Sequence, residues 1–296
     1  MKHLLSIADL TEKEIHDLIN LGIKIKKSPN KYRKKLKNKS LLMLFAKPSL
    51  RTHLSFDLAM TQLGGHPIFY NLENSPLGKK ESIKDGARVI SRYVDIIMAR
   101  LYEHSEMQEL AQFSSVPVIN GLDNLEHPAQ ILGDLMTIKE KLGTIENFKM
   151  AYLGDANNNI THSLMLAAWK LGFELNIACP KEKEFMPLKE ILDKTKTKIT
   201  TINDAVKNSG IIYTDTYMSY HIPASQEKRR LKILKPFQVN SKIMSLSKKA
   251  LFMHCLPAKR GDEVTDEVMD SKRSIIYDQA ENRLHIQKAI LLRALK

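Results

Sequence analysis

The sequence is poor in cysteine and in long apolar runs, and each shortage excludes a class of protein. Only two of the 296 residues are cysteines, so no disulfide framework is possible and we expect a reduced, cytoplasmic protein. No apolar run approaches the ~18–20 residues that a membrane span requires, so we expect no membrane association. The first residues also lack a long apolar run and reach Asp9 and Glu12 early, so we expect no signal peptide.

The charges, by contrast, are unbalanced towards the positive. The chain has 46 Lys and Arg against 33 Asp and Glu, a net charge of +13. Such an excess fits a nucleic-acid-binding protein, but the densest clusters, at 24–37 and 228–230, have little aromatic interleaving. We interpret them as a solvated surface that favours an anionic substrate, and we expect no nucleic-acid partner.

Strand-like and helix-like segments alternate along the chain. Apolar, β-rich runs predict strands at 41–45, 95–99, 117–120, 150–153, 173–178, 211–213, 251–254 and 275–277. Apolar residues with helical spacing lie between them, at 56–63 before Gly64 and at 131–142 before Gly143. This alternation predicts an α/β protein in which helices cover parallel sheets.

The helix predicted at 127–142 lies mid-chain, between two groups of strands. We interpret it as the connection between two doubly wound parallel-sheet domains, residues 1–142 and 143–280. Several predicted strands lead at their C-terminal ends into polar residues, where open parallel sheets bind their ligands. We therefore expect the active site in the cleft between the two domains.

Three short segments combine a turn signal with residues suited to an anion or an amine. They are Lys-Pro-Ser-Leu-Arg-Thr at 47–52, His-Pro-Ala-Gln at 127–130 and His-Cys-Leu-Pro at 254–257. The first follows a predicted strand and opens a helix, where backbone N–H groups and the helix dipole favour an anion. Taken alone, the same segment also fits an ordinary serine N-cap beside a solvated arginine.

Cys255 follows His254, and such a pair invites a nucleophilic or metal-binding interpretation. The other cysteine, Cys179, is too distant in sequence to give a zinc-binding spacing. Adjacent strand residues also point to opposite faces of a sheet. Taken alone, Cys255 therefore fits a buried apolar side chain, and we predict no metal site.

Further stretches extend the pattern of these segments: Met-Ala-Arg at 98–100, Pro-Val-Ile-Asn-Gly-Leu at 117–122, Tyr-Thr-Asp at 213–215 and Glu-Asn-Arg at 281–283. Together they resemble the aspartate/ornithine carbamoyltransferase family, over nearly the whole chain. The resemblance implies that residues 1–142 bind carbamoyl phosphate and that residues 143–280 bind ornithine. It also implies that a C-terminal helix at 281–296, with Arg283 at its start, packs back on the first domain.

The resemblance assigns a role to individual residues. It places carbamoyl phosphate against Ser49, Leu50, Arg51, Thr52, Arg100, His127, Gln130 and Arg283. It places ornithine against Asn159 (or Asn158), Asp215, Ser219, Tyr220, Cys255 and Leu256. The catalytic residues are then Arg100, His127, Cys255 and Arg283, while His66 reaches a neighbouring subunit's site.

The implied activity is transfer of the carbamoyl group from carbamoyl phosphate to the δ-amine of L-ornithine, which gives citrulline and phosphate. The resemblance implies a homotrimer that uses no metal and no organic cofactor. Leu50 stands where the family usually has Thr, and Tyr220-His221 replaces Met-Gly, so a carbamoyltransferase for N-acetylornithine, N-succinylornithine or putrescine is one alternative. A non-catalytic basic α/β binding protein is the other.

Overall fold

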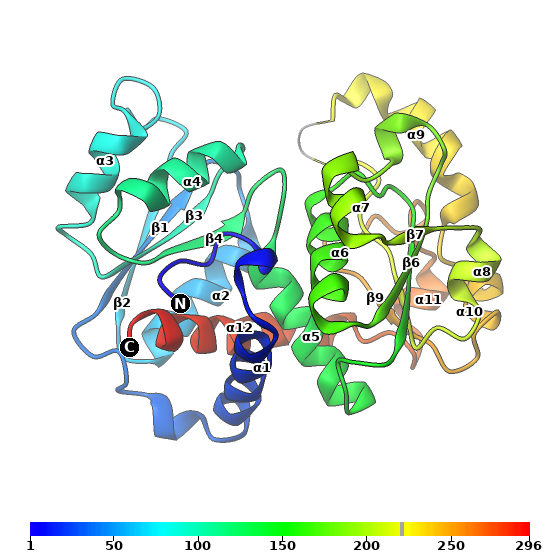
Figure 1. Ribbon diagram of the computed structural model, residues 1–296, viewed down its shortest axis with the longest axis horizontal. Helices are drawn as coiled ribbons and strands as arrows, with labels where there is room; N and C mark the ends of the chain where they lie inside the picture. Colours follow the sequence, from blue (N-terminus) through cyan, green and yellow to red (C-terminus); the bar gives the residue numbers. More distant parts are fainter. Residues whose placement is uncertain (220–221) are drawn as a thin grey trace. The chain divides into compact units, whose positions relative to one another are not determined.

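The chain folds into two compact units, each built on one parallel sheet (Figure 1). The computed structural model describes residues 1–219 and 222–296. The first unit comprises Met1–Met136 and Glu281–Lys296, and the second comprises Thr137–Ala280. Two helices, α5 (Pro128–Leu142) and α12 (Ile276–Ala294), therefore begin in one unit and end in the other.

The first unit has a four-stranded sheet in the order β2-β1-β3-β4, with all strand pairs parallel. Its strands are β1 (Ser40–Phe45), β2 (His66–Asn71), β3 (Ile96–Arg100) and β4 (Val118–Leu122). Besides its parts of α5 and α12, its helices are η1 (Ile7–Asp9), α1 (Glu12–Lys27), η2 (Pro29–Tyr32), α2 (Leu50–Gln62), α3 (Ile83–Ile90) and α4 (His104–Phe113).

Burial on both faces explains why the strands of this sheet are so apolar. Leu42 and Leu44 of β1 belong to a buried cluster that includes Met107 and Leu110 of α4. In Figure 1, α3 and α4 cover that face of the sheet, while α2 and α12 lie on the other. A strand covered on both faces reads as a continuous apolar run and not as an alternating one.

The second unit has a five-stranded sheet in the order β7-β6-β5-β8-β9, again with parallel pairs. Its strands are β5 (Lys149–Leu153), β6 (Glu174–Ala178), β7 (Lys198–Ile199), β8 (Ile211–Tyr213) and β9 (Leu251–Met253). Its own helices are α6 (Asn159–Leu171), η3 (Lys183–Phe185), α7 (Lys189–Thr195), α8 (Ile202–Val206), η4 (Ala224–Gln226), α9 (Glu227–Leu234), η5 (Lys235–Phe237), α10 (Ser241–Ser245) and α11 (Asp266–Met269).

The predicted fold class of two parallel α/β domains is confirmed, but one predicted strand is wrong. Residues 275–277 were predicted as a strand, but Ile275 precedes α12 and the next two residues begin that helix. A short apolar run cannot be assigned to helix or strand by periodicity alone, and here the helical residues that follow continue it. As a consequence, Arg283 lies within α12, several residues after its start at Ile276, and not at the start of a helix as predicted.

Two strands have no counterpart among the predictions. Five of the six residues of β2 are exposed, and this edge strand begins His66-Pro67, so it shows no buried apolar run. The strand β7 has only two residues. Both are edge strands, and edge strands carry the weakest sequence signal because one side of the strand is unpaired.

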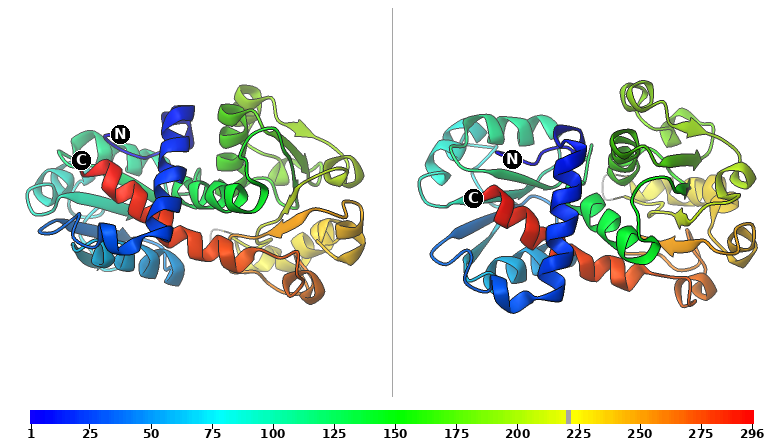
Figure 2. Two further views of the ribbon diagram at one scale, coloured as in Figure 1. Left: turned by 90° about the horizontal axis from the view of Figure 1, so that it is seen from below. Right: turned by 60° about the horizontal axis from the view of Figure 1, so that its bottom comes forward.

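In the first unit, α1 crosses α12 (Figure 2). Gly22 of α1 packs against Met136 of α5 as well, because a Cβ atom there would lie only 2.9 Å from Sδ of Met136, whereas its 3.5 Å distance to Cδ1 of Ile286 in α12 would be ordinary contact. Among the described residues, no helix is both long and apolar enough to cross a membrane.

Candidate functional site

In the first unit, the segment from Ala46 to Thr52 leads from the end of β1 into α2. Ser49 is the N-cap of α2, and its Oγ accepts a hydrogen bond from the backbone N–H of Thr52 at 3.3 Å. The first turn of a helix has N–H groups without intrahelical acceptors, and here they belong to residues beside Arg51. The predicted helix start is therefore present, with Ser49 as its cap.

Arg283 connects α12 to this helix start. Its Nη2 donates a 2.6 Å hydrogen bond to Oγ1 of Thr52, and both side chains are buried. Although Arg283 and Thr52 are far apart in sequence, the fold brings them into direct contact. Leu50, by contrast, is 70% exposed, so its side chain does not pack into this cluster.

Arg100 and His127 form a buried cluster with Arg283, in which the two arginines carry the positive charge. Arg100 ends β3 at a β-bulge, where its carbonyl accepts a 2.8 Å hydrogen bond from the N–H of Ala46. Burial lowers the pKa of His127 well below its ordinary value, and the nearby charges of Arg283 and Arg100 lower it further. His127 is therefore a neutral imidazole near two guanidinium groups.

The fourth predicted residue of this group is Gln130, in the first turn of α5. Its side chain is buried, and its Nε2 donates a 2.8 Å hydrogen bond to Oδ1 of Asp134. Its backbone N–H donates to the carbonyl of His127 at 3.0 Å. The helix start therefore carries both predicted residues, with the amide of Gln130 oriented by an aspartate one turn later.

A network of buried acids holds the loop before His127. Asp123 accepts hydrogen bonds from the N–H of Glu126 at 2.7 Å and from Nδ1 of His104 at 2.7 Å. Glu126 in turn accepts hydrogen bonds from Oγ of Ser6 and from the backbone N–H of Ile7. Burial raises the pKa of Glu126 to about 7. The N-terminal segment is thus fastened to the residue directly before His127.

Lys47 opens one of the three predicted segments, but the sequence assigned it no role of its own. Its side chain is buried, its Nζ lies 4.5 Å from the ring centroid of Tyr102, and it also donates to Oδ1 of Asn124. Burial, and then the charge of Arg100, lower the pKa of Lys47 to about 8. A lysine directly before a Pro-Ser helix start was the available signal.

A cavity of ≈ 520 Å³ lies against the segment that joins β1 to α2. Its lining residues come from the end of β1, from the segment between β1 and α2, from α2, from β2 and from the segments after β2 and β3: Phe45, Ala46, Lys47, Pro48, Ser49, Leu50, His53, Phe69, Asn71, Glu73 and Tyr102. Lys47 and Ser49 therefore border a space large enough for a small molecule.

In the second unit, Asp155 and Asn158 shape the turn after β5. Oδ1 of Asp155 accepts a 2.9 Å hydrogen bond from the N–H of Asn157. Asn158 is the N-cap of α6, and its side chain contacts the N–H of Thr161 at 2.8 Å and the carbonyl of Asp155 at 2.7 Å. Asn158 is therefore used by the turn itself, whereas Asn159, the first residue of α6, is partly exposed.

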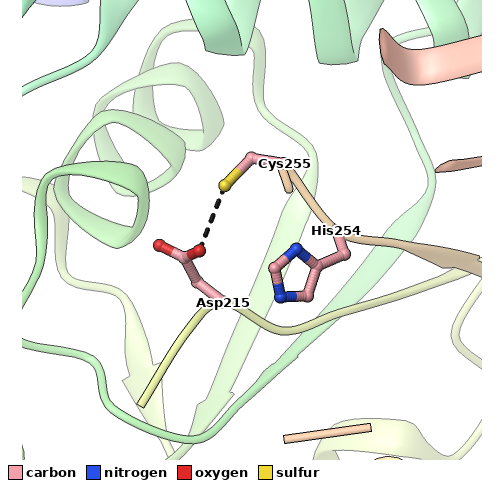
Figure 3. Close-up of side chains that lie close together, drawn as sticks. All are labelled: Asp215, His254 and Cys255. Atoms are coloured by element: carbon pink, nitrogen blue, oxygen red, sulfur yellow. Dashed lines mark hydrogen bonds between the residues drawn. The ribbon is translucent and has the colours of Figure 1, made fainter. Parts of the chain in front are cut away.

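Asp215 follows β8 and meets Cys255, which lies two residues after the end of β9 (Figure 3). The thiol of Cys255 donates a 3.0 Å hydrogen bond to Oδ1 of Asp215. The two parallel strands β8 and β9 are neighbours, so their C-terminal ends bring these side chains together. A thiol that donates to a carboxylate carries its proton, which does not favour a thiolate nucleophile.

His254 contributes to the shape of this loop. Its Nδ1 accepts a 2.8 Å hydrogen bond from the N–H of Leu256, and its own N–H donates to Oε1 of Gln279 at 2.9 Å. Leu256 adopts a positive φ of 59° before a cis proline bond. The fully buried His254 therefore holds the loop that presents Cys255 and Leu256.

Possible metal-ligand atoms of Asp215, His254 and Cys255 lie within 4.8 Å of one another. However, Nδ1 of His254 already accepts from the backbone, and its Nε2 lies 3.4 Å from Oε1 of buried Glu263. A metal ion binds through the lone pair of an imidazole nitrogen. In His254 the backbone N–H of Leu256 already uses the lone pair of Nδ1, and Glu263 lies beside Nε2. The group fits a hydrogen-bonded loop better than a metal centre.

Arg230 corrects one interpretation of the sequence, because the cluster at 228–230 is not wholly a solvated surface. Arg230 is 3% exposed, and it contacts the carboxylate of Asp155 and the carbonyl of Tyr217. Its Cζ also lies 4.7 Å from the ring centroid of Phe185. Arg230 thus connects the turn after β5 to the loop after Asp215.

Three further residues belong to the predicted site. Ser219 is partly buried, and its carbonyl accepts a 3.0 Å hydrogen bond from the N–H of Ile222. Tyr220 lies outside the described residues. His66 is exposed at the start of β2, away from the charged cluster formed by Arg100, His127 and Arg283.

Comparison with known proteins matches both halves of the chain to one family. The profile of the aspartate/ornithine carbamoyltransferase carbamoyl-P binding domain covers residues 2–140, and that of the Asp/Orn binding domain covers residues 146–294. The chain belongs to the aspartate/ornithine carbamoyltransferase family.

Several similar relatives carry the name of one branch of this family. Ornithine carbamoyltransferase of Archaeoglobus fulgidus is 47% identical and covers 100% of this chain and 98% of its own length. The Methanocaldococcus jannaschii protein of the same name is 46% identical, with 97% of both chains covered. The solved structure of the Pyrococcus furiosus ornithine carbamoyltransferase matches with a TM-score of 0.91 at 44% identity, covering 98% of this chain and 96% of that one.

Proposed function

We propose that this chain transfers the carbamoyl group of carbamoyl phosphate to the δ-amine of L-ornithine, giving L-citrulline and phosphate. The observation that carries the proposal is the buried charged cluster, in which Arg100, His127 and Arg283 come together beside the helix start at Ser49. Relatives that are named ornithine carbamoyltransferase, with 46–47% identity over 97–100% of the chain, support the same reaction.

The first unit would bind carbamoyl phosphate. The phosphate would lie on the first turn of α2, where Ser49, Thr52 and Arg51 supply donors in addition to the backbone N–H groups. The carbamoyl oxygen would face Arg100, His127 and Arg283. Because His127 is neutral, it can donate a hydrogen bond without adding repulsion between the two guanidinium groups.

The second unit would bind ornithine. The carboxylate of Asp215 suits the α-ammonium group, assisted by Ser219, while Asn159 suits the α-carboxylate. Asn159, the first residue of α6, is the first candidate, and Asn158, the N-cap of the same helix, is the near alternative. The Cys255 thiol and the Leu256 carbonyl would then border the reacting amine.

The chemistry needs no covalent enzyme intermediate. The lone pair of the neutral δ-amine attacks the carbamoyl carbon, the carbon–oxygen bond to phosphate breaks, and the amine proton passes to the departing phosphate. Arg100 and Arg283 would stabilise negative charge on the carbonyl oxygen, and Arg51 would stabilise charge on the phosphate. Holding both substrates in reach of one another supplies the remaining acceleration.

We also propose a homotrimer, and an exposed apolar surface supports it. This surface is formed by α2 and the neighbouring edge strand β2, with large side chains that are 37–70% exposed: Leu50, Leu54, Leu58, Ile68, Phe69 and Tyr70. Contiguous apolar residues of this kind mark protein contacts. His66 begins β2, so a subunit packed here would bring it near another copy. We retain the cytoplasm as the proposed location, since only two of the 296 residues are cysteines.

A citrulline assay with the purified protein tests the function. We expect L-ornithine to exceed N-acetylornithine, N-succinylornithine and putrescine by more than ~10-fold in kcat/KM. An acylated α-nitrogen has no charge for Asp215 and would leave that carboxylate desolvated, at a cost of about 1–3 kcal/mol. If another amine is the best acceptor, the ornithine assignment is wrong. If none is carbamoylated, the chain is a non-catalytic binding protein.

A further inference from the structure

A second cavity of the first unit, of ≈ 490 Å³, has a lining without any acidic residue. It is formed by the end of α1 and η2, by the end of α2 and by α12, through Ile25, Pro29, Tyr32, Arg33, Thr61, Gln62, Leu63 and Lys288. It shares no lining residue with the cavity beside Ser49. The two cavities lie against opposite ends of α2, so they are separate sites.

Lys288 is the unusual member of this lining. Its side chain is 3% exposed, and its Nζ donates a hydrogen bond to Oε1 of Gln62. Burial lowers the pKa of Lys288, and no carboxylate offsets that effect. A buried ammonium ordinarily requires an anionic partner, because one neutral amide does not replace its lost hydration.

The other polar groups of the cavity are also donors. Arg33 contributes a guanidinium group, and Tyr32 and Thr61 contribute hydroxyl groups. Arg33 belongs to the lysine-rich stretch at 24–37, in which Lys31, Lys34, Lys35 and Lys37 are exposed. These charges add a positive field around the cavity mouth, which favours an anion.

We propose that this cavity is a second anion-binding site, which takes a small organic molecule through its phosphate or carboxylate group. The anionic group contacts Lys288 and Arg33, and the Tyr32 and Thr61 hydroxyls donate to its remaining oxygens. The volume of ≈ 490 Å³ is within the range of small-molecule sites and leaves room for more than the anionic group alone. The lysine-rich stretch, which the proposed carbamoyl transfer does not use, thereby gains a function.

The test measures binding and not turnover, so its outcome is independent of the proposed reaction. Phosphate also fits the helix start at Ser49, and the Arg51→Ala background weakens that competing site. Titration calorimetry at constant ionic strength then uses two probes, inorganic phosphate and citrate, which separate phosphate from carboxylate recognition. We expect at least one probe to bind this background protein with a Kd below ~10 mM, the weak end of specific affinity.

Adding Lys288→Met to the background should weaken that binding at least ~10-fold, because a charge-assisted contact is lost. The methionine keeps an apolar side chain of similar length in the buried position. Lys37→Met is the matched control, since Lys37 is an exposed lysine of the same stretch that does not line the cavity, and it should change the Kd less than ~2-fold.

Arg33→Gln provides a second test on the exposed side of the cavity, where folding is not at risk. It should weaken binding by ~3-fold or more. The proposal is wrong if neither probe binds the background protein. It is equally wrong if Arg33→Gln changes the Kd no more than Lys37→Met does. Where the Lys288→Met protein folds, the same criterion applies to it.

Discussion

Replacing Arg230 by methionine should destabilise the second unit strongly, and more so at alkaline than at acidic pH. The arginine is 3% exposed and pairs with Asp155, which is 4% exposed. The substitution leaves a buried carboxylate without its cation. Breaking such a pair by removing one partner typically costs about 3–5 kcal/mol of unfolding free energy.

The pH dependence follows from the state of Asp155. Burial raises the pKa of Asp155 to about 6, although the charge of Arg230 acts in the opposite direction. A raised pKa stabilises the folded protein at low pH, and this contribution is lost as the pH rises through about 6. Without Arg230 the pKa of Asp155 rises further. Above about pH 6, Asp155 has lost its proton in the parent protein but still keeps it in the variant. Over that range the variant's deficit in unfolding free energy grows by up to ~1.4 kcal/mol per pH unit.

Urea denaturation at pH 5 and pH 8 measures the effect. We expect the Arg230→Met deficit to be larger at pH 8 by at least ~1–2 kcal/mol. The double variant Arg230→Met/Asp155→Asn should lose this pH dependence. Arg229→Met is the matched control, because Arg229 pairs with Glu184 on the surface and should shift the unfolding midpoint little. Equal deficits at both pH values, or a deficit no larger than that of the control, would refute the reasoning.

The other predictions concern catalysis by the first unit and by Cys255. Arg51→Ala should lower kcat/KM for carbamoyl phosphate at least ~100-fold, and near-normal turnover of the folded variant would remove the phosphate site from the helix start. Cys255→Ala should reduce but not abolish citrulline formation, whereas a carbamoyl or phosphoryl adduct trapped on Cys255 would contradict that role. Because the pKa of Lys47 is about 8, the KM for carbamoyl phosphate should rise between pH 7 and 9 as the ammonium loses its proton. Lys47→Met should raise the KM at pH 7 and flatten this profile, and an unchanged profile would separate Lys47 from substrate binding.

The sequence was sufficient for the fold class because its signals are local. Buried strands such as β1 appear as apolar runs. The helix after Ser49 is bounded in the sequence by this N-cap residue and by Gly64-Gly65. The edge strand β2 was missed since its residues are exposed, and the start of α12 was misassigned because a short apolar run fits either element. Such errors concern segments in which burial, and not the local pattern, decides the structure.

The candidate site divides in the same way. Ser49, Asp215 and Cys255 follow strands, where parallel sheets present their ligands. Each of them taken alone also fits a structural role, so it was the family resemblance that assigned their functions. Nothing in the sequence near Arg230 distinguishes it from Arg229, its exposed neighbour. What separates the two is contact with Asp155, 75 positions away, and this contact exists only after β5 and α9 have packed into one unit. A charge run therefore predicts a surface only on average, and the buried member is identified by its partner.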